Sequence, residues 1–456
     1  MSPSRRGYLS RPGDIPAPLQ PSRVAPVAGP PSPRDWIARP PARGGSPRAI
    51  AERARQARVR AVCLRSRYFG PVCALLLHHP ALKAKPPNRS GADGAQTKVG
   101  AVLRYASLQY LRAAAVISVL ILHSHLLFDA PLLTLPLLSD FGWLGVRLFF
   151  VISGFIVADR IGTCSNLADY LIRRVVRVFP LYFLVGSFAA AFAVVAGGHI
   201  FLLPRTDSGL PFDPHWPSYL LMSLFMVPQD AWPIFAVGWS LEFEVVFYGL
   251  FGLAYFALGP RAAAPIVLAF AVAGLCGVLA GSHVAHPFML YFFAGCLCRE
   301  VFRASPDTAY RSALVVLVPA TVLWVAHLYG LLDLGNGGFV LASAASFASL
   351  LLVSLTWEPV FAGAVWGRWI VRIGDASFSI YLGHWLVFCL LRPLTVELSG
   401  QAWILEALRW GIVAGAVALS IAVHRKIELP VNRAVLHRVG RLRARVAPNR
   451  ARTQEG

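Results

Sequence analysis

Charged residues are scarce in this chain: only 14% of its 456 residues are Asp, Glu, Lys or Arg, while 56% are hydrophobic. The mean hydropathy is +0.58. A soluble protein of this size needs more charge to cover its surface. The composition therefore excludes a large soluble protein and indicates an all-α protein that crosses a membrane several times.

Cysteine is also sparse, and its placement argues against a disulfide framework or a metal centre. Four of the seven cysteines lie in apolar segments, where a thiol behaves as a small hydrophobe: Cys276, Cys296, Cys298 and Cys389. The Cys296/Cys298 pair has no neighbouring His or Cys in the sequence to complete a ligand set. We therefore expect no metal site.

The net charge of +21 is concentrated at the two ends of the chain. Residues 1–104 carry 19 basic and 4 acidic side chains, and residues 425–456 carry 9 and 2. A basic tail without interleaved aromatics or a known module does not indicate a nucleic-acid partner. We expect a disordered, Pro/Arg-rich tail over 1–104, a transmembrane domain over 105–424 and a basic cytosolic tail over 425–456.

Between the tails the sequence is a series of apolar runs, each near the 20 residues that span a bilayer. We predict ten transmembrane helices, with approximate limits 106–128, 141–159, 177–196, 235–257, 262–281, 286–304, 311–330, 338–357, 375–395 and 402–423. Nearly every arginine of the connecting loops falls on one side if both termini are cytosolic, as the positive-inside rule requires. Residues 217–228 are too short to span.

Ionisable groups within spans are costly, so they indicate function more strongly than groups elsewhere. Arg112 and His123 are eleven residues apart in the first span, which places them on one helix face about 16 Å apart along the axis. We expect them to line one polar tunnel. Taken alone, Arg112 also fits a boundary residue reaching the interface, and His123 fits a packing histidine.

Arg174 and Arg177 stand at i and i+3 on one helix face. Two adjacent guanidiniums suit a diphosphate or a 3′-phosphate, although ordinary cytosolic charge explains them equally well. In the fourth span Glu242 and Glu244 lie about 200° apart around the helix. Glu244 is a candidate partner for His123 or Arg147.

Five segments occur in an order and spacing that resemble the membrane acyltransferase-3 family over residues 105–424. They are Arg112-x10-His123, the Gly145–Gly154 segment, Arg174-x-x-Arg177, the Trp239–Tyr248 segment and the Ser377–His384 segment. Each is weak alone, and the five in order are specific. The sequence departs from the usual family pattern at Arg147 and Gly383.

The resemblance implies transfer of an acyl group, with acetyl expected, from acyl-CoA to a carbohydrate hydroxyl. His123 would then be the general base or carry the acyl group in a relay, and Glu244 would orient it. Arg112, Arg174 and Arg177 would hold the phosphates of coenzyme A or stabilise oxyanion charge. Supporting roles are expected for His125, Glu242, Ser153, Tyr381 and His384. Acyl-CoA is expected as a substrate, with no permanently bound cofactor.

The expected acceptor is an envelope polysaccharide or a lipid-linked oligosaccharide, and the expected location is the inner membrane of a bacterium. The exopolysaccharide branch of the family fits the opening of the first span, Leu108–Arg112, most closely. The alternative is a transporter or flippase of a lipid-linked sugar, because intramembrane Arg, His and Glu also serve transport.

Overall fold

The computed structural model describes residues 105–128, 142–195, 216–228, 233, 235–278, 282–363, 367–395, 398 and 400–452. All of them belong to one unit, Gly94–Gly456. The predicted tail over 1–104 lies outside the described residues. The description therefore concerns the predicted transmembrane domain and the helix that follows it.

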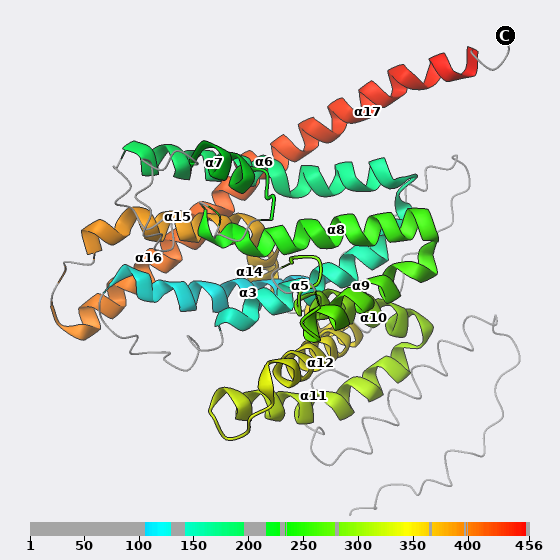
Figure 1. Ribbon diagram of the computed structural model, residues 1–456. Coiled ribbons are helices and arrows are strands. Elements are labelled where there is room, and N and C mark those ends of the chain that lie inside the picture. Colours follow the sequence, from blue (N-terminus) through cyan, green and yellow to red (C-terminus); the bar gives the residue numbers. More distant parts are fainter. Residues whose placement is uncertain are drawn as a thin grey trace, which may run out of the picture. The chain divides into compact units, whose positions relative to one another are not determined.

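Every secondary-structure element within the described ranges is helical (Figure 1), as the composition predicted. The α-helices are α3 (Ala106–His123), α5 (Gly142–Arg160), α6 (Leu167–Val195), α7 (Trp216–Leu224), α8 (Trp239–Leu258), α9 (Pro260–Leu275), α10 (Met289–Ala304), α11 (Pro306–Leu328), α12 (Gly335–Thr356), α13 (Glu358–Gly363), α14 (Gly367–Asp375), α15 (Ser377–Thr395), α16 (Ala402–Val423) and α17 (Leu429–Arg452). Short 3₁₀ turns at Ser124–Leu127, Ile161–Thr163 and Ala236–Gly238 adjoin α3, α5 and α8.

Seven of the described helical segments are long and apolar enough to cross a membrane, so the multi-pass helical class is confirmed. They are Ala106–Leu127, Leu167–Phe192, Ala236–Leu258, Pro306–Leu328, Gly335–Thr356, Ser377–Thr395 and Ala402–Arg441. Helices α5, α9 and α10 occupy the other three predicted spans. Because α9 and α10 have only 16 residues each, they fall short of the usual spanning length. Ten crossings therefore stays a prediction.

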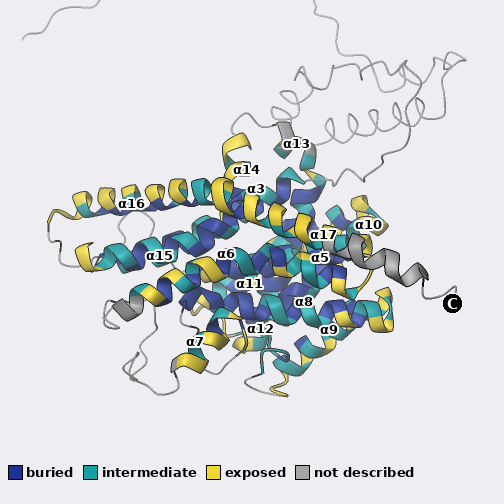
Figure 2. Ribbon diagram, turned by 90° about the horizontal axis from the view of Figure 1, so that it is seen from above, coloured by how far each residue is buried: buried dark blue, intermediate teal, exposed yellow. Residues whose placement is uncertain are grey.

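Small residues let the central helices approach one another closely. A Cβ added at Gly145 of α5 would meet the backbone of Ala115 on α3. Gly154 of α5 and Gly295 of α10 each lie against the backbone of the other helix, at Phe292 and Val151. Such contacts are typical of membrane helices. They fix α5 between α3 and α10, and Figure 2 shows the buried residues gathered in these central helices.

The chain remains helical past the predicted end of the domain at residue 424. A π-helical turn, His424–Glu428, joins α16 to α17, and α17 extends beyond the other helices (Figure 1). Inserted π-turns often occur at functional positions. Here the turn buries the Glu428 carboxylate, which accepts hydrogen bonds from Ser379 at 2.5 Å and from His424 at 2.7 Å. Part of the predicted basic tail is thus the ordered helix α17.

Two native cysteines provide a test of the predicted orientation. Cys164 lies between α5 and α6, on the side expected to be cytosolic. Cys276 falls within the predicted span 262–281, but α9 ends at Leu275 and Cys276 is an exposed residue of the turn that follows. With Cys63 and Cys73 replaced by serine, a membrane-impermeant maleimide added to spheroplasts should label Cys276 and spare Cys164 until the cells are permeabilised. Burial raises the pKa of the Cys164 thiol, so its labelling should remain slow even then. The reverse labelling pattern would show that the chain has the opposite orientation in the membrane.

Candidate active site

A small cavity of about 70 Å³ lies where five helices converge. Its polar lining comes from α3, α5, α6, α8 and α15, and consists of Arg112, Ser153, Arg174, Arg177, Ser240, Glu244, Tyr248, Ser377 and Tyr381. Aromatic and aliphatic side chains, including Phe149, Phe150 and Phe378, fill the remainder. The structure therefore gathers all three predicted phosphate-binding arginines around one space, together with Glu244.

Arg112 is held in the cavity by neutral groups. Its Nε donates to Ser377 Oγ at 3.1 Å, and its Nη1 donates to Gln109 Oε1 at 3.4 Å. Ser377, the first residue of α15, can accept this bond because the preceding helix lies close to α3: Gly374 of α14 packs directly against the α3 backbone at Gln109. These contacts orient the guanidinium without neutralising its charge.

Arg174 faces the cavity over two aromatic rings. Its guanidinium carbon lies 5.5 Å from the ring centre of Tyr170 and 5.3 Å from that of Tyr248. Among the residues that the structure describes, its buried Nε has no hydrogen-bond partner. Within the described part of the chain, neither Arg174 nor Arg177 forms an ion pair with a carboxylate. A buried donor without a partner is unfavourable, so this corner of the cavity suits an anion.

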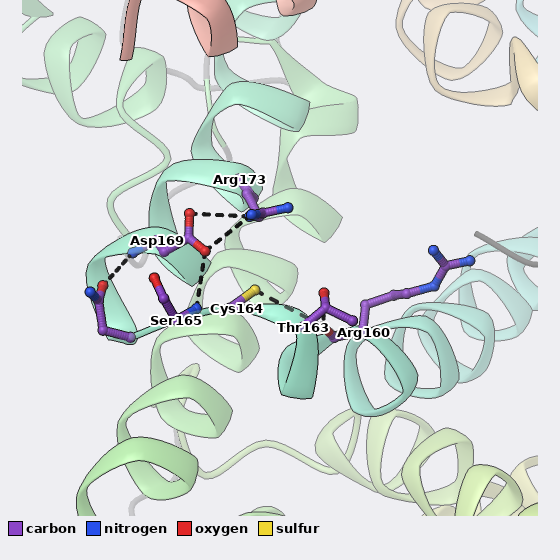
Figure 3. A network of polar contacts seen from close by, with 7 residues as sticks. Arg160, Thr163, Cys164, Ser165, Asp169 and Arg173 are labelled. Carbon is purple, nitrogen blue, oxygen red and sulfur yellow. Dashed lines mark hydrogen bonds and ion pairs between the residues drawn. The ribbon is translucent and has the colours of Figure 1, made fainter. Parts of the chain in front are cut away.

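The adjacent arginine, Arg173, is engaged differently. Its Nη2 lies 3.1 Å from Asp169 Oδ2, one helical turn earlier on α6 (Figure 3). Asp169 also accepts from the Ser165 backbone N–H at 3.2 Å, while Asn166 Oδ1 accepts from the Asp169 backbone N–H at 2.9 Å. This reciprocal arrangement caps the start of α6. Arg173 thus serves the helix terminus and does not line the cavity.

Glu244 is fixed by hydroxyl groups. Its carboxylate accepts a hydrogen bond from Ser153 Oγ at 2.7 Å and another from the Tyr248 hydroxyl. The predicted pairing of Glu244 with His123 or Arg147 is therefore wrong. Glu244 faces α5 at Ser153, nearly two turns along from Arg147. The Arg147 guanidinium instead lies 4.7 Å from the ring centre of Phe339.

His123 has a different partner, at the end of α3. Its Nδ1 lies 2.9 Å from Nε2 of His384 on α15, and the two rings are nearly parallel, at 6°. Trp385 packs edge-on against His123, with ring centres 5.0 Å apart. Two histidines 261 residues apart in sequence therefore form one pair.

The hydrogen bonds of the neutral pair define its proton positions. His384 Nδ1 lies 2.9 Å from the carbonyl oxygen of Ile380. Because a carbonyl only accepts, His384 Nδ1 carries the proton and its Nε2 accepts. His123 Nδ1 must then donate to that Nε2, which leaves a lone pair on His123 Nε2. The assignment follows from the hydrogen-bond network and makes His123 Nε2 the basic atom.

This architecture matches a known family over most of the chain. Residues 105–425 match the model of the acyltransferase-3 family, described as an acyltransferase domain. The chain belongs to the acyltransferase-3 family. The match includes every site residue predicted from the sequence, so the resemblance read from the five motifs is confirmed.

Two curated relatives are similar to this member of the family. The "Exopolysaccharide production protein ExoZ" of Rhizobium meliloti (strain 1021) is 29% identical over 314 residues, which covers 64% of this chain and 90% of the relative. The "Putative acetyltransferase ORF330" of Acidianus two-tailed virus is 37% identical over 84 residues, 18% of this chain and 24% of that protein. No solved structure matches the chain.

The cavity and the histidine pair are neighbouring but separate features of this acyltransferase. Tyr381 lines the cavity and bonds to Ser240 Oγ at 2.8 Å, and its ring centre lies 5.9 Å from that of His384. His123 is not among the cavity-lining residues. A single tunnel joining Arg112 to His123 therefore remains a prediction, and Tyr381 stands between its two parts.

Two predicted supporting residues lie outside both features. His125 is exposed and its Nδ1 is bonded to the Leu122 carbonyl in the turn after α3. Glu242 turns to the opposite side of α8 from Glu244 and meets His283, with Nε2 and Oε2 3.2 Å apart. The sequence reasoning assigned no role to Tyr248, Ser377 or His283. Tyr248 alone had a local signal, because it follows Glu244 by one helical turn.

Proposed function

We propose that this protein transfers an acyl group, acetyl in the simplest case, from acyl-CoA to a hydroxyl of an envelope polysaccharide or of its lipid-linked precursor. The observation that carries the proposal is the cavity, whose Arg174 and Arg177 form no ion pair with a carboxylate of the described residues. The family supports acyl transfer, and the likeness to an exopolysaccharide production protein supports a polysaccharide acceptor. The family does not favour the transporter alternative.

The donor would bind at the arginine end of the cavity. Acyl-CoA carries a diphosphate and a 3′-phosphate, which guanidinium groups recognise through paired hydrogen bonds. Arg112, already oriented by Ser377, would complete a three-cation site. The cavity is too small for the nucleotide, so it would admit the acyl thioester end while the phosphates remain near the arginines at its mouth.

The reaction needs one base. The acceptor oxygen forms a bond to the thioester carbonyl carbon, the carbon–sulfur bond breaks, and coenzyme A leaves as the thiol after taking up a proton. The acceptor hydroxyl must lose its proton as it attacks, and a histidine is suited to receive it near neutral pH. His123 Nε2 is the atom that the hydrogen bonds leave available, with His384 holding the ring in place.

The location follows from the same reasoning. A multi-pass protein that uses a cytosolic donor to modify an envelope sugar belongs in the inner membrane of a bacterium. Arg112 lies in the first half of α3 and His123 at its end, so the donor would enter from the cytosol and the acceptor from the outer face. For the direct attack, the thioester carbonyl would have to extend past Tyr381, so that the acceptor hydroxyl, deprotonated by His123, can reach its carbon.

Mass spectrometry of purified envelope polysaccharide tests the proposal. Polysaccharide from cells with the gene should carry acyl groups that are missing from a deletion strain, and a plasmid copy should restore them. His437→Ala, at an exposed position on α17, should restore them equally well. Unchanged acylation in the deletion strain, together with a loss of polysaccharide export, would replace the proposal with the transporter alternative.

A further inference from the structure

A group of polar and aromatic side chains lies at the end of the helices away from Arg112, Arg174 and Arg177, where Arg147 of α5 also lies, 6.0 Å from the ring centre of Phe288. We call it the outer cluster: Trp239, Glu242 and Phe243 at the start of α8, and His283, His286 and Phe288 before α10. The start of α5 lies at the same end, because Gly142 packs against Leu122 near the end of α3. This is the end of α3 that carries His123.

Glu242 is the least satisfied member of the outer cluster. Its side chain is only 2% exposed, and its Oε2 lies 3.2 Å from His283 Nε2. Its other oxygen, Oε1, is buried and has no hydrogen-bond partner among the described residues. A buried carboxylate oxygen with no donor is costly. Glu242 Oε1 is therefore an acceptor that a donor of a ligand, such as a hydroxyl, could satisfy.

Aromatic rings surround this carboxylate. His283 stacks on Phe243 with ring centres 4.5 Å apart, and His286 lies 4.4 Å from Phe288. Trp239 lies 5.8 Å from Phe288. The rings provide apolar faces next to a hydrogen-bonding pair.

The outer cluster adjoins the cavity and opens toward the surface. Phe150 lines the cavity and also packs against Phe288, with ring centres 5.8 Å apart. On the other side, Trp143 is 49% exposed and lies 6.4 Å from Trp239. Trp143 and Trp239 thus form a partly exposed aromatic edge beside the outer cluster.

We propose that the outer cluster binds one sugar unit of the acceptor, and this inference rests on the proposed function. A sugar ring has hydroxyl groups around its rim and apolar C–H faces, so it requires donors and acceptors beside flat apolar surfaces. Glu242 Oε1 accepts a bond from one hydroxyl, His283 fixes the carboxylate, and Trp143 and Trp239 cover an apolar face. The sugar is thereby held at the end of the protein that carries His123.

Direct binding without any donor tests this inference. The probe is polysaccharide from the deletion strain, freed of any ester-linked acyl groups by mild alkali, titrated into the full-length protein in nanodiscs and followed by calorimetry. Glu242→Gln and Trp143→Ala are expected to weaken binding at least tenfold. Glu300→Gln and Trp403→Ala, which change an exposed glutamate and an exposed tryptophan elsewhere, should bind as the wild type does. Thermal unfolding identifies any variant that has lost its fold, and His283→Gln then replaces it.

The outcomes separate this inference from the proposed function. Wild-type affinity in Glu242→Gln and Trp143→Ala would overturn the sugar site, as would a wild-type protein that acylates the polysaccharide without binding it measurably alone. In either case the acyltransferase proposal would stand. If binding follows the expected pattern but the deletion strain still acylates its polysaccharide, the sugar site holds and the proposed transfer reaction fails.

Discussion

Replacing His123 with alanine is expected to reduce acyl transfer by about 10²–10⁴-fold, the usual contribution of a positioned general base. The Nε2 lone pair of His123 is the basic atom that the His123–His384 hydrogen bond leaves available. The measurement is the rate of transfer from labelled acetyl-CoA to unacylated polysaccharide in membrane vesicles. Donor binding should be unchanged, because His123 does not line the arginine-containing cavity.

His384 distinguishes a positioning role from simple packing. His384→Gln retains a side-chain oxygen that can accept from His123 Nδ1, so it should keep more activity than His384→Ala at equal expression and thermal stability. His125→Ala serves as the matched control, because among the described residues that exposed histidine bonds to the Leu122 carbonyl of its own turn. Full activity in His123→Ala would exclude it as the base and move the assignment to Glu244.

The helical membrane class and the placement of Arg174 and Arg177 on one helix face could be predicted from the sequence because their signals are local. A run of apolar residues near 20 indicates a membrane span wherever it occurs. The spacing of Arg174 and Arg177 fixes them on one helix face. The structure adds that Arg112, from a different helix, lies beside them in the same cavity. This meeting was expected only from the family resemblance.

The partners of the buried acids and histidines could not be predicted, because they depend on contacts between distant segments. The spacing within α8 showed that Glu242 and Glu244 point to different sides, but gave no information about what each one meets. Glu242 pairs with His283, in a connection that carried no motif. His123 pairs with His384 across 261 residues. Such pairings are set by helix packing, which here follows glycine contacts such as Gly154 with Phe292.

Arg174, which forms no ion pair with a carboxylate of the described residues, is expected to be important for binding the acyl donor. Arg174→Ala should raise the KM for acetyl-CoA roughly tenfold to a hundredfold, since hydrogen bonds to charged groups contribute about 1.5–3 kcal/mol. Arg174→Lys should recover only part of the loss, because an ammonium cannot reproduce the paired donors of a guanidinium. The KM for the polysaccharide should not change.

The adjacent residue provides a stringent control for this prediction. Arg173→Ala removes the same charge one position earlier, but that guanidinium is engaged by Asp169 at the start of α6 (Figure 3). If the cavity binds the donor phosphates, only Arg174→Ala should raise the donor KM. If general positive charge at this end of the helices attracts the donor, the two variants should be equally impaired.

Ionic strength separates these two explanations further. Attraction by dispersed surface charge is screened by salt over about 8–10 Å under ordinary buffer conditions. Direct bonds in a buried site are screened much less. The donor KM of the wild type should therefore rise only modestly between low and moderate salt. The donor KM of Arg174→Ala should remain the same multiple of the wild-type value. If the ratio of the two KM values instead falls toward one as salt is added, Arg174 acts by long-range electrostatic attraction. The donor would then bind at another site.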